Sequence, residues 1–511
     1  MKQPTSDSTV VTIQHFSFQS QASAALCDKL ASNRGVLLQG GTGTGKTYIA
    51  AQCIKDVLPT LEANDKLGKG PFPVLWVCPA ATKLQTERVL KAYNIQSKVM
   101  VMSYATLTSP ATGGTMFYAT ETIVEWGAEH IVFKWHELML PRLVVFDECQ
   151  ALKNDDSTRT RIARNLPTDN VKRMFISATP YQRVCEARTV MVGVGMTSPY
   201  NIIPLSEDTA PSVLRSLATY NQPTRYSPRA MERVKEVMDN YTVALKGIRF
   251  KYKARTECVL VHFRNDKERD AYSNAYNEYL EELYRLRGQT GHGTVAARLV
   301  AMQKFRQKAE EVRSPLIATR ARNAVVEGSQ VIIASNFKIM LQGVHIALTQ
   351  TYGVPEDHIG YVTGKQTAEQ RQRDVDAFQR GEKDYMLLTI QAGGVGISLH
   401  HEHDNARPRH IILPPTWSAI DLIQCVGRSH RITSKSNTLQ EILWYSGTIE
   451  EQVAHVVENK VKCINKAVSA REQWASLFAP HNNDDELGNV DEGADDEQDY
   501  GMDEGLWDDK S

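Results

Sequence analysis

The sequence predicts an α/β fold built of two lobes, each a parallel sheet covered by helices. The early stretch GVLLQGGTGTGKTYIAAQCI (35–54) has the pattern of a short apolar strand, a glycine-rich turn and a helix. The later half, from QVIIASNF (330–337) onward, repeats the order of strand and helix without such a turn. Strands that alternate with helices are typical of parallel sheets, so the two halves predict two lobes.

The composition is that of a globular protein that can bury large cores. The chain has 511 residues, of which 42% are hydrophobic and 23% are charged. No run approaches the roughly 18 apolar residues of a membrane helix, and the first ten residues lack the apolar part of a signal peptide. The eight cysteines are scattered and include no C-x-x-C pair, which predicts neither a zinc site nor a disulfide framework. We therefore expect a reducing compartment, the nucleus of a eukaryote or otherwise the cytoplasm, and no membrane partner.

The charge is strongly asymmetric along the chain. Residues 484–511 hold thirteen Asp or Glu and one Lys, which gives this segment a charge of −12. The rest of the chain therefore carries about +12, because 59 basic residues balance 59 acidic ones overall. The segment predicts a disordered acidic tail, and the positive remainder suits a polyanionic partner. The tail has two open interpretations: it keeps the protein soluble, or it occupies a basic surface in place of nucleic acid.

A phosphate-binding loop follows the first predicted strand. Its pattern is G-x-x-x-x-G-K-T, in which glycines let backbone N–H groups turn toward phosphate oxygens and a helix N-terminus adds positive potential. Lys46 would reach the β- and γ-phosphates, and Thr47 would bind Mg²⁺. The residues predicted to bind ATP in this loop are Gly40, Gly41, Thr42, Gly43, Thr44, Gly45, Lys46 and Thr47.

Two carboxylates end a second apolar run. In RLVVFDECQALKN (142–154), residues 143–146 predict a buried parallel strand, and Asp147 and Glu148 follow it directly. Ligands bind at the carboxyl ends of strands in α/β sheets. Asp147 would hold Mg²⁺ through water, and Glu148 would polarise the attacking water.

With this pair the chain resembles superfamily-two helicases and translocases, whose lobes are RecA-like. Other stretches follow that superfamily's order: PVLWVCPA (73–80), VMVMSYATL (99–107) and MFISATP (174–180). The resemblance implies nucleic-acid contacts at Pro79, Ser103, Ser177 and Thr179. It also implies that Gln19, with Gln21 as the alternative, reads the adenine of ATP.

The second lobe carries two further stretches of that order. TIQAGGVGISL (389–399) resembles the superfamily's fifth motif, and its glycines permit close approach to phosphate or ribose. The resemblance implies nucleic-acid contacts at Thr389, Gly393 and Gly394, and a nucleotide contact at Gly396.

The stretch LIQCVGRSHRI (422–432) resembles the sixth motif, Q-x-x-G-R-x-x-R, through Gln424, Arg428 and Arg431. Arginines three residues apart are expected on one helical face. The resemblance implies that all three residues are catalytic. For the two arginines the reason is that a guanidinium neutralises charge on the transferring phosphoryl group. Since these residues lie on the second lobe, hydrolysis is expected to need lobe closure.

The spacing favours one branch of the superfamily. Roughly 150 residues separate Pro180 from Val331, and they contain helix-like stretches at 228–245, 265–286 and 295–313. SWI/SNF-type translocases of double-stranded DNA carry helical insertions there, and DECQALKNDDS, AGGVGISL, PTWSAIDLIQCVGRSHRI and SGTIEEQV resemble their motifs. The chain departs from that branch in GGTGTGKT, in SATP and in Gln150, which stands where the branch has His.

The predicted organisation is a first lobe at 1–182, a mainly helical inter-lobe region at 183–325, a second lobe at 326–470 and an acidic tail at 471–511. The resemblance implies an ATP- and Mg²⁺-dependent translocase on double-stranded DNA, of chromatin-remodelling or repair type, directed by chromatin or other protein partners. Two alternatives stay open. One is a strand-separating helicase acting on DNA or RNA, and the other is a nucleic-acid-binding scaffold whose hydrolysis is uncoupled because of Gln150.

Overall fold

The two-lobed α/β fold is confirmed by a computed structural model of the chain. The structure describes residues 16–64, 66–109, 114–125, 128–155, 157–167, 169–196, 226–246, 248–289, 292–364, 366–393, 397–404 and 406–467. The candidate positions Gly394 and Gly396 and the acidic tail lie outside these residues. The chain divides into two compact units, the first extending to Arg249 and the second beginning at Phe250. The last helix begins in the second unit, and its residues from Lys462 belong to the first.

The first unit is built on a six-stranded sheet whose strands are all parallel. Their order across the sheet is β3-β2-β6-β7-β1-β8. The strands are β1 (Gly35–Gln39), β2 (Val74–Cys78), β3 (Val99–Ser103), β6 (Leu143–Asp147), β7 (Lys172–Ser177) and β8 (Thr242–Ala244). Because β7 lies between β1 and β6, the segments that follow these three strands meet at one edge of the sheet.

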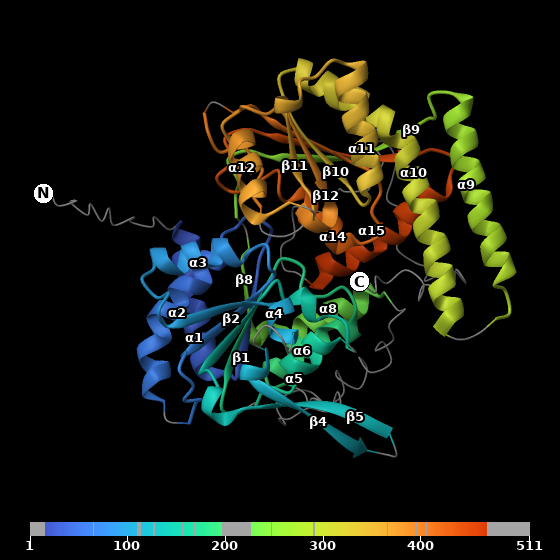
Figure 1. Cartoon of the computed structure of the whole chain (residues 1–511). Coiled ribbons are helices and arrows are strands. Elements are labelled where there is room, and N and C mark those ends of the chain that lie inside the picture. The colour runs from blue at the N-terminus through green and yellow to red at the C-terminus, as the bar shows by residue number, and fades with distance from the viewer. Residues whose placement is uncertain are drawn as a thin grey trace, which may run out of the picture. The chain divides into compact units, whose positions relative to one another are not determined.

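Helices cover both faces of this sheet (Figure 1). Successive strand residues point to opposite faces, so Val36 and Leu38 join one core and Leu37 joins the other. The face of Val36 is covered by α1 (Ser17–Ser32), α2 (Lys46–Ala63) and α3 (Lys83–Ala92). The opposite face is covered by α4 (Tyr104–Thr108), α5 (Thr158–Arg164), α6 (Val184–Gly193), α8 (Pro228–Met238) and the end of α15 (Ile449–Ala467).

An antiparallel hairpin also belongs to the first unit. It consists of β4 (Tyr118–Glu125) and β5 (Ala128–Trp135), paired from Tyr118↔Trp135 to Glu125↔Ala128. The aromatic rings of Tyr118 and Phe133 meet edge to face with centroids 5.3 Å apart and anchor its base in the core. The hairpin was not predicted from the sequence.

The second unit has its own six-stranded parallel sheet. The order is β11-β12-β10-β13-β14-β9. The strands are β9 (Ala254–Val261), β10 (Gln330–Ser335), β11 (Ile359–Val362), β12 (Tyr385–Thr389), β13 (Arg409–Leu413) and β14 (Thr438–Tyr445). The helices are α9 (Asp266–Arg285), α10 (His292–Val326), α11 (Lys338–Ile346), α12 (Ala368–Gln379), α13 (Ile390–Gly393), α14 (Ala419–Val426) and most of α15.

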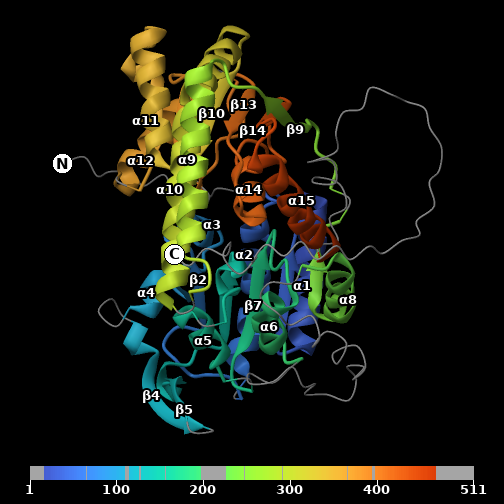
Figure 2. The ribbon, with the colours of Figure 1, turned by 90° about the vertical axis from the view of Figure 1, so that its right-hand side faces the viewer.

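The long helices α9 and α10 form a pair that precedes β10 (Figures 1 and 2). Tyr272 of α9 meets Phe305 of α10 edge to face, with ring centroids 5.5 Å apart, in the core of the second unit. Within the described parts of the chain, no helix is both long enough and apolar enough to span a bilayer.

The region 183–325, which was expected to be mainly helical, also supplies one strand to each sheet. The helix expected at 228–245 ends at Met238, where the Thr242 hydroxyl donates to the Met238 carbonyl, and β8 follows and pairs with β1. Strand β9 pairs with β14 along its whole length. Neither strand alternates clearly between buried and exposed residues, which is why the sequence pattern missed them.

Candidate active site

The glycine-rich loop joins β1 to α2 and wraps around the Lys46 side chain. Gly43 and Gly45 have φ of +74° and +81°, a backbone conformation that residues other than glycine rarely adopt. The Lys46 ammonium donates to the carbonyls of Gly40 and Gly41, at 3.0 Å each. The Thr44 hydroxyl donates to Gly41 O at 2.9 Å. This conformation points the loop toward the N-terminus of α2, where anions bind.

Gln19 supports this loop from α1. Its amide Nε2 donates to Thr44 O at 3.1 Å, and its Oε1 accepts from the backbone N–H of Phe16 at 3.1 Å. The side chain is buried, whereas Gln21, the alternative considered from the sequence, is exposed. Gln19 is therefore the glutamine next to the loop, and its contact with adenine stays a prediction.

Asp147 and Glu148 lie at the carboxyl end of β6, at the same sheet edge as the loop. Asp147 is buried, and the pKa of its carboxyl is raised to about 7, mainly by this burial and also by the Glu148 charge, while the Lys46 charge opposes the shift. The Glu148 N–H donates to Asp147 Oδ1 at 3.0 Å, and the Tyr104 hydroxyl donates to Asp147 O at 2.9 Å. A buried acid beside a lysine and a phosphate loop suits a cation site.

Glu148 has a left-handed backbone, with φ of +50° and ψ of +55°. Such a conformation in a residue with a side chain costs free energy, on the order of 1–3 kcal/mol, and tends to occur at functional sites. It directs the chain into a short 3-10 helix, Cys149–Leu152, immediately after the two carboxylates.

A relay of hydrogen bonds joins Glu148 to the stretch after β7. Gln150 Nε2 donates to Glu148 Oε2 at 2.9 Å, and the Ser177 hydroxyl donates to Gln150 Oε1 at 2.6 Å. Ser177 Oγ in turn accepts the Thr179 N–H at 2.9 Å. The Gln150 amide thus uses its donor on one side and its acceptor on the other. Gln150, treated from the sequence as a departure that weakens coupling, connects Glu148 to the Ser-Ala-Thr segment.

Several side chains expected to contact nucleic acid are buried instead. Ser177 and Thr179 are 0% and 1% exposed and face the relay. Ser103 is 5% exposed, and its hydroxyl caps α4 by accepting the Thr106 N–H. The hydroxyls of Ser177 and Ser103 are used within the first unit, which argues against direct contact, and Thr179 joins the relay through its backbone N–H. Pro79 lies half-buried at the end of β2, where its carbonyl accepts from Thr82.

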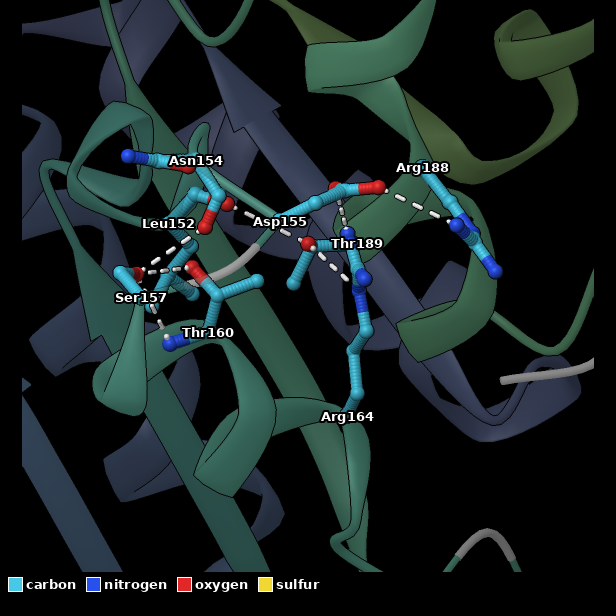
Figure 3. A network of polar contacts seen from close by, with 8 residues as sticks. All are labelled: Leu152, Asn154, Asp155, Ser157, Thr160, Arg164, Arg188 and Thr189. Atoms are coloured by element: carbon cyan, nitrogen blue, oxygen red, sulfur yellow. Dashed lines mark hydrogen bonds and ion pairs between the residues drawn. The ribbon is translucent and has the colours of Figure 1, made fainter. Parts of the chain in front are cut away.

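A polar network braces the chain just beyond the two carboxylates (Figure 3). Asp155 forms ion pairs with Arg164 of α5 and Arg188 of α6. Arg164 Nε also donates to the Thr189 hydroxyl at 3.0 Å, which in turn donates to Leu152 O at 3.2 Å. The network ties the segment after Glu148 to α6, the helix after the Ser-Ala-Thr segment. The pairing of Asp155 with Arg164 and Arg188 was not predicted from the sequence, because these residues are 9 and 33 positions apart.

Substituting Asp147→Asn is expected to stabilise the nucleotide-free protein at alkaline pH. The pKa of Asp147 in the fold, about 7, exceeds the ordinary value of 3.8, so its ionisation costs stability as the pH rises between these values. The asparagine side chain keeps the oxygen that accepts the Glu148 N–H and removes that cost. We expect a higher unfolding temperature than the wild type at pH 8 in magnesium-free buffer, by about 2–4 °C per kcal/mol recovered. A gain of the same size at pH 5 would contradict the assigned cause.

Substituting Gln150→Leu is expected to lower kcat for ATP on the order of tenfold and to leave KM unchanged. A hydrogen bond to a charged group contributes about 1.5–3 kcal/mol, and about 1.4 kcal/mol corresponds to a factor of ten. Gln52→Leu is a matched control, since the Gln52 amide donates to the exposed Asp56 on α2, away from the relay. Steady-state hydrolysis assays of both variants decide the point. An unchanged kcat in Gln150→Leu would show that the relay has no catalytic role.

The second unit contains the remaining candidate positions. Thr389 ends β12 and is buried, and Gly393 ends the short helix α13 that follows it. Gln424 lies buried in α14. The predicted helical face for Arg428 and Arg431 is wrong, because α14 ends at Val426 and both arginines lie beyond its end.

Side chains terminate that helix early. The carbonyl of Val426 accepts from the Ser429 hydroxyl at 2.7 Å and from Gln440 Nε2 at 2.9 Å, so its oxygen is no longer available to a continuing helix. Arg428 is held by its backbone, with its N–H donating to Cys425 O and its carbonyl accepting from the Leu399 N–H. The sequence pattern could not show these tertiary hydrogen bonds, and the roles of Gln424, Arg428 and Arg431 stay predictions.

The residues of the first unit fit a nucleoside triphosphate with Mg²⁺. The two left-handed glycines and the Lys46 ammonium supply N–H donors and positive charge for phosphate oxygens. The Thr47 hydroxyl and the Asp147 carboxylate are oxygen ligands of the kind that Mg²⁺ prefers. Glu148, held by Gln150, offers a carboxylate at the same edge.

Comparisons with known proteins agree with this geometry. Residues 17–187 match the family model of DEAD/DEAH box helicases, and residues 322–433 match that of the helicase conserved C-terminal domain. Over 470 residues the chain is 25% identical to a putative ATP-dependent RNA helicase, L364, of Acanthamoeba polyphaga mimivirus, covering 85% of this chain and 78% of that protein.

Two further relatives match shorter stretches. A putative ATP-dependent helicase/translocase of Bacillus subtilis, YwqA, is 25% identical over 169 residues, which are 33% of this chain and 17% of that protein. The chromatin structure-remodeling complex protein SYD of Arabidopsis thaliana is 28% identical over 132 residues, 24% of this chain and 4% of that protein. The two matched domains and the helicase relatives identify the chain as a helicase-type, nucleic-acid-dependent ATPase of superfamily two.

Proposed function

We propose that the protein is an ATP-dependent translocase on double-stranded DNA, of the SWI/SNF type. The observation that carries the proposal is the α9–α10 pair, a helical addition directly before β10, where SWI/SNF-type translocases insert helices. The relatives named as a translocase and as a remodelling protein add support over parts of the chain. Chromatin or other proteins would then direct the motor to its target.

The chemistry assigned to the first unit starts at the phosphate loop. Lys46 and Thr47 would hold ATP and Mg²⁺, and Mg²⁺ would supply charge neutralisation at the phosphates. Asp147 would help to hold Mg²⁺, and Glu148 would accept a proton from the attacking water. The relay through Gln150 keeps Glu148 oriented and links it by hydrogen bonds to the Ser-Ala-Thr segment. In this assignment Gln424, Arg428 and Arg431 of the second unit stabilise the charge that develops on the transferred phosphoryl group.

A strand-separating helicase is the second candidate. The mimivirus relative, which matches 85% of this chain, is named as an RNA helicase, and the β4–β5 hairpin provides an element that could stand between strands. The hairpin sequence opposes this role, since Glu121, Glu125 and Glu129 outnumber Lys134 and would repel phosphates.

The deciding experiment compares displacement of a triplex-forming strand with unwinding of a duplex. A translocase on double-stranded DNA is expected to displace the third strand with ATP and to leave a plain duplex intact. The variant Lys46→Ala serves as the control that removes hydrolysis. Unwinding without triplex displacement would overturn the proposal in favour of the helicase.

The polymer that stimulates hydrolysis gives an independent test. Phosphate contacts predict stimulation by double-stranded DNA that falls steeply as salt rises and depends little on base sequence. Steady-state hydrolysis is compared with single-stranded DNA, double-stranded DNA and duplex RNA at two salt concentrations. Equal turnover with every polymer would identify the uncoupled scaffold.

A further inference from the structure

Two thiols face each other between the helices α1 and α2. Cys27 lies on α1 and Cys53 on α2, and their Sγ atoms are 3.2 Å apart although the residues are 26 positions apart in sequence. Cys53 is fully buried, while Cys27 is partly exposed. Both residues belong to the first unit.

The two thiols are chemically unequal. When Cys27 ionises, the Cys53 thiol can donate to it, and this hydrogen bond lowers the pKa of Cys27 while the same bond and burial raise the pKa of Cys53. The carboxylates of Asp28 and Asp56 oppose the shift at Cys27. The thiolate is the form that reacts with oxidants, so the more accessible sulfur is also the more reactive one. A reactive thiol beside a buried thiol that can resolve it is the arrangement of redox-sensitive pairs.

The helices that carry these thiols hold two parts of the nucleotide site. Helix α1 begins with the turn that bears Gln19, whose amide donates to Thr44 O of the phosphate loop. Helix α2 begins at Lys46 itself. A covalent bond between Cys27 and Cys53 would therefore fix the Gln19 helix against the helix of the phosphate loop.

We propose that Cys27 and Cys53 form a reversible disulfide upon oxidation by a peroxide, and that this bond slows ATP hydrolysis. The Cys27 thiolate attacks one peroxide oxygen, the O–O bond breaks, and Cys27 sulfenic acid and hydroxide form. The Cys53 thiol then attacks the sulfenic sulfur, forming the S–S bond and releasing water. Two thiols are oxidised by two electrons and one peroxide is reduced to two waters; a dithiol reductant reverses the reaction.

The disulfide between Cys27 and Cys53 would change the contact between α1 and α2 by a distance large enough to affect catalysis. A disulfide brings its sulfurs to about 2.05 Å, so the pair must approach by roughly 1 Å from the present 3.2 Å. Displacements of about 1 Å in a catalytic constellation can cost on the order of 100-fold in rate. Because part of the approach is taken up by side-chain rotation, we expect a fall in kcat of about tenfold.

The test treats the full-length protein with hydrogen peroxide, blocks remaining thiols by alkylation and identifies disulfide-linked peptides by mass spectrometry without reduction. Hydrolysis is measured on the same samples before and after dithiothreitol. The variant Cys27→Ser removes the reactive thiol, and Cys258→Ser removes a partly exposed thiol of the second unit as a matched control.

The expected result is a linked pair of peptides containing Cys27 and Cys53, a loss of hydrolysis that dithiothreitol restores, and resistance to peroxide in Cys27→Ser but not in Cys258→Ser. Separately alkylated Cys27 and Cys53 after peroxide treatment would overturn the proposal. A linked pair with unchanged hydrolysis would overturn its regulatory part, as would equal inactivation of Cys27→Ser. Peptide linkage needs no DNA, so it is independent of whether the protein is a translocase.

Discussion

Replacing Arg428 with alanine is expected to reduce ATP turnover on the order of 10³- to 10⁵-fold while ATP binding is retained. An arginine that neutralises charge on the transferring phosphoryl group has this size of effect, because it acts mainly in the transition state. Binding is retained because the phosphate loop, which holds Lys46, belongs to the first unit. Turnover is measured at saturating ATP and nucleic acid, and binding is measured separately with a fluorescent nucleotide.

The control for this variant is Arg255→Ala. Arg255 is exposed on β9 of the same unit, where it pairs with Glu257. Its loss therefore removes a similar charge and leaves the stretch 422–432 unchanged. Arg255→Ala is expected to hydrolyse ATP at nearly the wild-type rate. If Arg428→Ala keeps its fold but no longer binds ATP, its assigned role is wrong.

Replacing Glu148 with glutamine is expected to lower kcat on the order of 10²- to 10⁴-fold, the usual contribution of a general base. Glutamine has nearly the same shape, so the left-handed backbone and the packing around the site are preserved. Single-turnover hydrolysis of bound ATP isolates the chemical step from product release. Nucleotide affinity is expected to stay within about threefold of the wild type, since the carboxylate acts in the transition state.

A second glutamate of the first unit, Glu186, provides a comparison for this variant. Glu186 is buried, and its carboxylate accepts from Arg183 and from the Gln182 N–H. Glu186→Gln is expected to affect unfolding temperature more than hydrolysis. Wild-type single-turnover rates in Glu148→Gln would exclude Glu148 as the base.

The core of the fold was predictable because its strands are fully buried. Continuous apolar runs such as 143–146 marked strands of the parallel sheets, and the residues just after them marked the functional edge. The β4–β5 hairpin, β8 and β9 were missed because their residues are largely exposed or their pairing is long-range. Strand β8 exists because it pairs with β1, about 200 residues earlier, which no local pattern reveals.

The candidate site was predictable as a set of residues and less so as an arrangement. Lys46, Asp147 and Glu148 were recognisable because their motifs are local in sequence. The relay from Glu148 through Gln150 to Ser177 joins two segments only through their shared sheet edge, so the sequence showed an unusual residue without its partners. The turn that holds Arg428 likewise depends on Gln440 of β14.

The first unit needs residues from the far end of the folded chain. Cys463 and Ala467 lie in its core, and Gln39 Nε2 donates to the Ala467 carbonyl at 3.3 Å. During synthesis from the N-terminus, the core of the first unit is therefore completed only after the residues of the second unit up to Val461 have been synthesised. Until then its core is open on the side that the end of α15 covers, and a nascent chain stalled before residue 463 would expose apolar surface there. The unit that carries the phosphate loop thus completes its core only when the end of α15 has been translated.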